Sequence, residues 1–250
     1  MLRKLTPVLG LVLFLVFVAP AAVATTVHGD FFGTNIDFLG IQETSSYGDP
    51  EPACCFGAPI ATGNQLLFFP PNFTAEASGA GGSDQTGAQL QGTIMATGAL
   101  NTIDTIILDE FGDALLTGTG SAATGTFASL SGFVTVLEVL GVPVTPVVIG
   151  FIGTFTPSEL LALPTDAGTT LWSANASIDV ASVVPNATKV FLSLDNDLSA
   201  FSEAGTSAKL QKKVVSGPAI VITVIPEPTT AILFSLGLIG LALQGRRQRS

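Results

Sequence analysis

The stretch Trp172–Val180, "WSANASIDV", indicates the fold most directly. Its apolar side chains occupy every second position, and serine, asparagine or aspartate stands between them. Successive side chains of a β-strand point to opposite faces, so this alternation predicts a strand with one buried and one solvent-facing side. The fold is therefore expected to be built from half-buried strands.

Further segments of similar character recur at intervals of roughly ten residues, the spacing typical of a sandwich of short strands. Glycine-rich stretches such as Ala77–Asp84, "ASGAGGSD", and Glu110–Asp113, "EFGD", are predicted as turns between them. The pattern predicts an all-β fold, a single antiparallel β-sandwich-like domain over residues 25–223. The other expected strands are Asn35–Glu43, Gln65–Phe69, Gln89–Thr97, Thr102–Leu108, Ala114–Thr117, Gly132–Leu140, Thr145–Phe155, Lys189–Leu194, Ala208–Val215 and Ile220–Val224.

One short helix is expected within this domain, at "TPSELLAL" from Thr156 to Leu163. Thr156 can serve as its N-cap, Pro157 suits the first helical position, and Glu159 completes a capping box. Pro164 would end the helix after about two turns.

Basic residues are confined to three places in this acidic chain, which has a formal net charge of −10. Residues 5–188 contain no Lys or Arg at all. Such a surface repels phosphate backbones, so the sequence argues against nucleic-acid binding. Low charge and high glycine content favour a β-rich exported protein over a helical cytosolic enzyme.

The N-terminus has the three parts of a signal peptide, predicted over residues 1–24. Arg3 and Lys4 precede the apolar run Val8–Val18, and Ala22 and Ala24 form a small-residue site for signal peptidase. The mature chain is expected to begin at Thr25. Export would place it in an oxidising compartment.

The C-terminus also has three consecutive parts: a proline-containing triplet, an uncharged apolar run and a basic end. Pro226, Glu227 and Pro228 form an extended, helix-incompatible triplet, which precedes the uncharged run Thr229–Leu243. As a helix the run would extend about 22 Å, short for a bilayer core of roughly 30 Å. The basic residues after it should stay on the cytoplasmic side of the inner membrane. They are Arg246, Arg247 and Arg249.

This order of triplet, short apolar helix with "LGLIGLAL" and terminal "RRQR" resembles the PEP-CTERM sorting signal, here over residues 224–249. The resemblance implies a transmembrane precursor that exosortase, a membrane protease, processes near the triplet. It implies export through the inner membrane, followed by display on the cell surface or release into extracellular matrix. It transfers no activity to the domain.

The domain has few candidate residues for catalysis or redox chemistry. His28 is the only histidine, and a site near the expected mature terminus holds a catalytic side chain poorly, so it is expected to be solvated. Cys54 and Cys55 are adjacent, which leaves open a thiol pair, a strained local disulfide or intermolecular pairing. The 17 phenylalanines are expected mostly in the core.

Two acidic clusters are weak candidates for a metal site. Asp109, Glu110 and Asp113 are expected around one turn, and Asp195 and Asp197 lie together in "LDND". Hard cations such as calcium take several oxygen ligands, although neither stretch follows an EF-hand pattern. Solvated carboxylates are the alternative, and no other cofactor is expected.

The sequence thus favours a non-catalytic exported protein. A polysaccharide- or calcium-binding adhesive module is a second hypothesis. A secreted hydrolase is a third and weaker one, because the chain has no P-loop or GxSxG motif.

Overall fold

The computed structural model describes residues 25–47, 55–98, 101–213 and 217–226. These residues form strands joined by turns and loops, and no helix occurs among them. The strands are β1 (Thr25–Phe32), β2 (Ile36–Ser45), β3 (Ile60–Thr62), β4 (Gln65–Phe68), β5 (Thr74–Ser78), β6 (Gly82–Ala96), β7 (Ile103–Thr117), β8 (Gly125–Val139), β9 (Val142–Ile152), β10 (Thr154–Thr156), β11 (Leu160–Ala162), β12 (Gly168–Asp179), β13 (Ala187–Ser202), β14 (Ser207–Gln211) and β15 (Ile220–Pro226).

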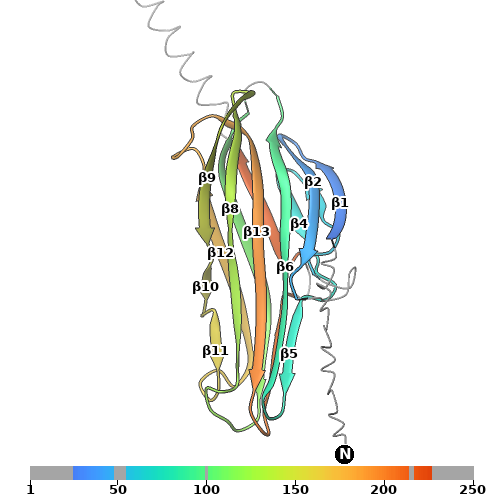
Figure 1. Cartoon of the computed structure of the whole chain (residues 1–250), viewed down its shortest axis with the longest axis vertical. Coiled ribbons are helices and arrows are strands. Elements are labelled where there is room, and N and C mark those ends of the chain that lie inside the picture. Colours follow the sequence, from blue (N-terminus) through green and yellow to red (C-terminus); the bar gives the residue numbers. More distant parts are fainter. Residues whose placement is uncertain (1–24, 48–54, 99–100, 214–216, 227–250) are drawn as a thin grey trace, which may run out of the picture.

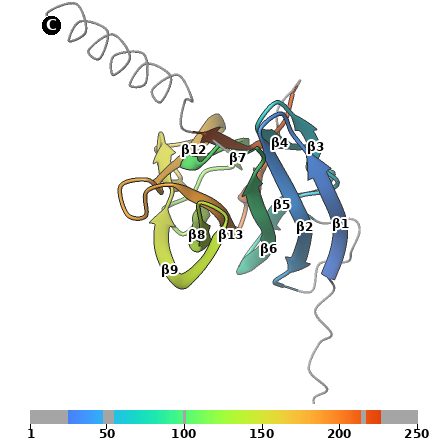
Figure 2. The same cartoon turned by 90° about the horizontal axis from the view of Figure 1, so that it is seen from above.

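Two antiparallel sheets face each other in an elongated body (Figure 1). Sheet A has the order β1-β2-β6-β13-β8-β11, and β9 also pairs with β8. Sheet B has the order β10-β12-β7-β15-β4-β3, and β14 joins β7 to β5. Figure 2 separates the two layers when the molecule is seen from above. The predicted all-β, antiparallel, sandwich-like architecture is confirmed for the described residues.

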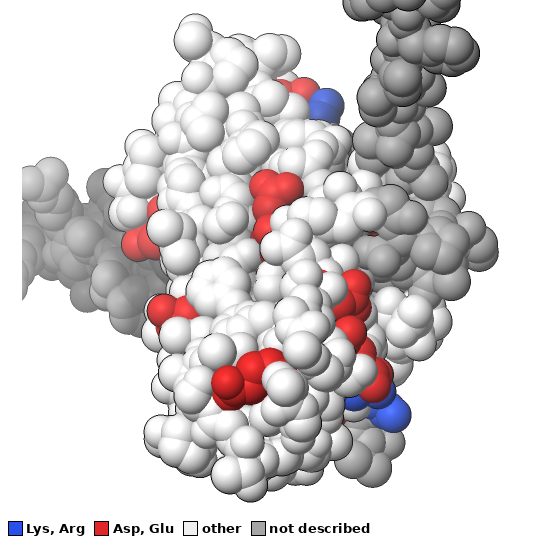
Figure 3. Space-filling view, turned by 60° about the horizontal axis from the view of Figure 1, so that its bottom comes forward, with Lys and Arg blue, Asp and Glu red and all other residues white. Residues whose placement is uncertain are grey.

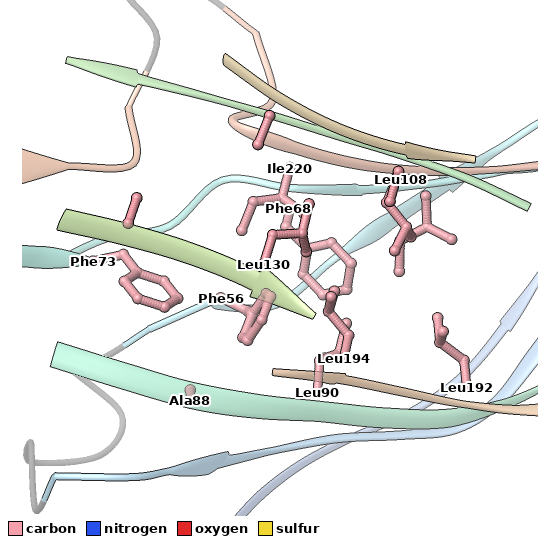
Figure 4. Packing of buried hydrophobic residues seen from close by; sticks show 14 of the residues in the cluster. Phe56, Phe68, Phe73, Ala88, Leu90, Leu108, Leu130, Leu192, Leu194 and Ile220 are labelled. Atoms are coloured by element: carbon pink, nitrogen blue, oxygen red, sulfur yellow. The ribbon is translucent and has the colours of Figure 1, made fainter. Parts of the chain in front are cut away.

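The core lies between the two sheets, where alternate side chains of each strand point inward. Phe56, Phe68 and Phe73 fill one part of it, with the Phe56 ring centroid 5.6 Å and 5.5 Å from the other two (Figure 4). Both pairs meet edge to face, the geometry that aromatic quadrupoles favour. Burial of this apolar surface is the main force that holds the sheets together.

Four strands are much longer than the alternation predicted: β6, β7 and β8 have 15 residues each, and β13 has 16. The turn predicted at Glu110–Asp113 is wrong, because this stretch lies inside β7. Gly112 is needed there for close packing, since a Cβ atom would lie 2.5 Å from the Trp172 ring. Glycines of "ASGAGGSD" do form a turn, with positive φ at Gly79 and Gly81.

The helix expected over Thr156–Leu163 is also wrong. The segment instead contributes the short strands β10 and β11, which pair with β12 and β8 respectively. Leu161 and Leu163 are both buried, a two-residue period that suits a strand. The open edges of those neighbouring strands supply backbone hydrogen bonds that outweigh the local capping signal.

The predicted signal peptide and C-terminal transmembrane helix lie outside the described residues. Within the described part, no helix is long and apolar enough to cross a membrane. The first and last described strands begin at Thr25 and end at Pro226. The domain boundaries expected at residues 24 and 223 stay predictions.

Candidate functional site

The C-terminal triplet begins within sheet B rather than after a linker. Strand β15 lies between β7 and β4, and Pro226 at its end stands opposite Ile103. Of the predicted sorting residues, only Pro226 is described. Glu227, Pro228, Arg246, Arg247 and Arg249 lie outside the described part, as do Ala22 and Ala24.

Apolar side chains are exposed at the end of the sandwich where β15 finishes. Leu140 in the β8–β9 turn and Val142 at the start of β9 are 66% and 62% exposed, and Val183 in the β12–β13 loop is also exposed. The Leu140 N–H donates to the Asn186 carbonyl oxygen, which ties these two loops together. The surface that surrounds the exit of the chain is thus partly apolar.

The candidate acidic residues do not meet. Asp109 and Asp113 lie on the outer face of sheet B, where Asn175 and Gln211 donate hydrogen bonds to them at 2.7 Å and 2.9 Å. On the outer face of sheet A, the other pair, Asp195 and Asp197, lies on β13. Glu110 points the opposite way, into the interior, and is fully buried.

Such placement leaves the carboxylates scattered over a largely uncharged surface (Figure 3). Among the described residues, no group of three or more His, Cys, Asp or Glu side chains is placed to hold a metal ion. Strand alternation turns Glu110 away from Asp109, and the two aspartate pairs lie on the outer faces of different sheets.

The interior contains a polar cluster, which we define as Glu110 of β7, Asn196 of β13 and Lys212, the residue after β14. Asn196 Nδ2 donates to Glu110 Oε1 at 2.6 Å, and Lys212 Nζ donates to Asn196 Oδ1 at 2.5 Å. Lys212 Nζ also donates to Glu110 Oε2. Two sheets are joined by this cluster, since Glu110 belongs to sheet B and Asn196 to sheet A.

Apolar groups surround the cluster. Lys212 Nζ lies 5.1 Å from the centroid of the Phe73 ring and 5.8 Å from the Trp172 ring. Burial lowers the pKa of Lys212 from its ordinary value, although the charges of Glu110 and Asp197 oppose this effect. The backbone N–H of Lys212 donates to the Phe73 carbonyl oxygen at 2.9 Å, which holds the main chain at this residue.

A second buried carboxylate lies near one edge of sheet A. Glu43 accepts a hydrogen bond from the Phe56 N–H at 2.7 Å, and its other oxygen lies 3.3 Å from His28 Nε2. The histidine contact lacks the alignment of a hydrogen bond. The expectation that His28 is solvated is wrong. Its side chain is only 7% exposed, because β1 pairs with β2 and this places His28 next to Glu43. Cys55, next to Phe56, is disulfide-bonded, and Cys54 lies outside the described residues.

The outer face of sheet A carries a chain of amide side chains, which we call the glutamine row: Gln42, Gln91, Gln89 and Asp195. Gln42 Nε2 donates to Gln91 at 3.5 Å, Gln91 donates to Gln89, and Gln89 donates to Asp195 at 2.9 Å. It crosses β2, β6 and β13. Further along β13, Asp197 accepts from Ser129 Oγ at 3.3 Å.

Two hollows flank the glutamine row, and both contain aromatic side chains. One is lined by Phe133, Phe151 and Asp195, the other by Tyr47, Gln85 and Ser199 among others. The expectation that phenylalanines lie mostly in the core is thus only partly correct. Burial, followed by the charge and hydrogen bond of Asp197, raises the pKa of Tyr47.

The comparisons with known proteins concern mainly the C-terminus. Residues 224–247 match the family model described as the PEP-CTERM protein-sorting motif. This confirms the resemblance seen in the sequence and indicates an exported protein that passes through a membrane-anchored precursor and is targeted to exosortase. No curated protein matches the chain.

Among solved structures, the comparison gives the "Loop Swap mutant of Necallimastix patriciarum Xyn11A". It is 12% identical, with 81% of this chain and 100% of that chain covered, and the TM-score is 0.21. A similarity at this level carries no argument about fold or activity.

Sequence reasoning missed the interior cluster, although a signal for it was present. Each member continues a two-residue period of buried side chains: Glu110 comes after Leu108, Asn196 after Leu194, and Lys212, just past the end of β14, after Leu210. A polar residue at a predicted inward position needs a partner, since an unpaired buried charge is costly. Only Lys212 lay within a predicted strand, Ala208–Val215, whereas Glu110 and Asn196 lay two residues beyond the predicted ends Leu108 and Leu194. Continuing the alternation past those ends could have indicated three inward polar positions.

Proposed function

We propose that this chain is a non-catalytic exported protein whose β-domain is displayed on the cell surface or released into extracellular matrix. Exosortase would act near Pro226–Pro228 after signal peptidase has cut before Thr25. The observation that carries this proposal is the PEP-CTERM motif over residues 224–247.

The position of β15 supports the proposal. A cut after Pro226 would leave all seven residues of β15 in the domain, where the strand pairs with β7 over its whole length and with β4 over Ile220–Thr223. All fifteen described strands would therefore remain in the processed chain. The product of processing would be an intact sandwich.

The mature termini test this proposal directly. Intact-mass and peptide measurements on protein from its own cells should give a start at Thr25 and an end near Pro226–Pro228. A variant with Pro226→Ala and Pro228→Ala should keep its tail, because the extended triplet is lost. A wild-type chain that retains Ser250, or one found only in the cytoplasm, would contradict the proposal.

A second candidate function is polysaccharide binding on the outer face of sheet A. Sugar hydroxyls can hydrogen-bond to the glutamine row, and apolar sugar faces can pack on exposed rings such as Phe133. Glycan arrays with and without calcium would test it. Binding should be lost in Gln89→Ala and Phe133→Ala but kept in Leu171→Ala, which changes an exposed residue of sheet B.

Absence of binding to every glycan on the array would count against this second function. Loss of glycan binding in Leu171→Ala alone would place the binding site on sheet B and contradict a site on sheet A.

A further inference from the structure

We infer that the interior cluster forms an intramolecular isopeptide bond, in which Lys212 Nζ becomes covalently joined to the side-chain carbonyl carbon of Asn196. Glu110 is the catalytic residue for this single event. The inference is independent of the sorting proposal, because it concerns residues far from both termini.

The reacting groups are already in mutual contact. Nζ of Lys212 lies 2.5 Å from the Asn196 carbonyl oxygen, so the nucleophile is placed beside the carboxamide that it would attack. Glu110 touches both nitrogen atoms: one oxygen accepts from Lys212 Nζ and the other from Asn196 Nδ2 at 2.6 Å. Holding reactants together in this way greatly raises their effective concentration.

Glu110 is placed for proton transfer from one nitrogen to the other. An amide nitrogen is a poor leaving group unless it is protonated, and an ammonium is no nucleophile until it loses a proton. A carboxylate that contacts both atoms can remove the proton from the first and supply one to the second. Neither of the other two residues could perform this role.

The surroundings favour the uncharged amine. Glu110 and Asn196 are fully buried, Lys212 is 2% exposed, and the Phe73 and Trp172 rings lie near Nζ. Burial lowers the pKa of Lys212, which increases the fraction of the nucleophilic form. Exclusion of water also protects the intermediate from hydrolysis.

The reaction balances without any further reagent. Glu110 takes a proton from the Lys212 ammonium, and the neutral Nζ attacks Cγ of Asn196 to form a C–N bond. A proton then passes from Nζ through Glu110 to Nδ2, the Cγ–Nδ2 bond breaks, and ammonia leaves. Ammonium, carboxylate and carboxamide thus become secondary amide, protonated Glu110 and ammonia. The net effect is that both charges disappear from the interior.

The bond would join the two sheets covalently. Asn196 lies in β13 of sheet A, and Lys212 directly follows β14 of sheet B. Hydrophobic contacts between the sheets would then be reinforced by a link that persists if they separate. Such a link suits a domain that works outside the cell.

Mass spectrometry of the purified, full mature protein tests the inference. After reduction of the disulfide and assignment of the termini, its intact mass should be lower than the sequence mass by one ammonia. Trypsin cannot cut after an acylated Lys212, so peptide 190–209 should be found joined to peptide 210–213. Unmodified, unlinked peptides containing Asn196 and Lys212 would overturn the inference. Such unlinked peptides would mean that Lys212 and Glu110 form a buried ion pair without any covalent bond to Asn196.

Three variants test separately the role of Lys212 as nucleophile and the role of Glu110 as catalyst. Lys212→Met should abolish the loss of ammonia, while Lys209→Met, a change of the exposed lysine on β14, should leave it intact. Glu110→Gln should slow cross-linking by about a hundredfold or more, as loss of a general acid–base group does. An unchanged rate in Glu110→Gln would overturn the role given to Glu110. Should Lys212→Met fail to fold, the wild-type peptide map still decides.

Discussion

Glu43 and Glu110 are both buried glutamates, yet the molecule accommodates them in different ways. Glu43 lies near the β1 edge of sheet A and accepts a hydrogen bond from a backbone N–H, with His28 beside it. Glu110 lies between the sheets and is bonded to the side chains of Lys212 and Asn196. In the second case the partner is a lysine side chain that is itself almost fully buried.

This difference has energetic and chemical consequences. Near the sheet edge, backbone geometry satisfies the carboxylate, and its loss leaves one N–H without an acceptor. In the interior, removal of Glu110 leaves an ammonium without its counterion, which is much more costly. The groups that could react meet in the interior, where β7, β13 and the residue after β14 bring side chains of both sheets together.

The largest expected effect is that of Glu110→Ala. It should lower the free energy of unfolding by about 3–5 kcal/mol, since Lys212 is left as a buried charge, and it also removes the catalyst of cross-linking. Urea denaturation measures the change. The double variant Glu110→Leu with Lys212→Met should recover the part of this loss that comes from the buried charge, because apolar side chains can replace a buried ion pair, but not the part that comes from the missing cross-link. A loss below about 1 kcal/mol in Glu110→Ala would contradict the comparison.

Glu43→Ala should destabilise less, by about 1–3 kcal/mol, because the Phe56 N–H loses its acceptor in a buried place. Glu43→Gln is the matched control. It keeps an oxygen atom for that N–H and should cost about 1 kcal/mol or less. Equal losses in the two variants would show that the hydrogen bond to Phe56 is unimportant.

The pH dependence of the free energy of unfolding distinguishes a free Lys212 amine from a cross-linked one. In Glu110→Gln, burial lowers the Lys212 pKa without an adjacent carboxylate to oppose it. The unfolded chain keeps this proton up to the ordinary pKa of 10.5, so it binds more protons than the folded chain below that pH. Stability should therefore rise with pH between the lowered pKa and 10.5, by at most about 1.4 kcal/mol per pH unit.

Urea denaturation of Glu110→Gln across this range checks the slope, with the double variant Glu110→Gln and Lys212→Met as the control that should lack it. The cross-linked wild type should lack it too, since an amide nitrogen does not titrate there. A wild type with the same slope as Glu110→Gln would mean that its amine is free.

The smallest effect is expected for Lys209→Met. Lys209 and Glu76 form an exposed ion pair at 3.4 Å, and such pairs contribute little because water screens them. The free energy of unfolding should change by about 0.5 kcal/mol or less. A loss comparable to that of Glu110→Ala would mean that burial is not what distinguishes the two lysines.

Local pattern was sufficient for much of the fold. The alternation in Trp172–Val180 correctly predicted part of β12, and similar alternation located most of the other strands. It failed at Thr156–Leu163, where the capping pattern suited a helix but sheet edges were available as partners. It also failed at Glu110–Asp113, where a glycine that makes room for Trp172 resembled a turn signal.

The sequence by itself determined most of the long strands, the acidic character and the sorting motif, because each depends on residues that are neighbours in the chain. Only the tertiary structure decided that Glu110, Asn196 and Lys212 meet. They are separated by up to 102 positions, and their contact depends on which strands of the two sheets face each other. Alternation fixes which side of a strand a residue occupies, whereas the partner across the core is set by the packing of the sheets.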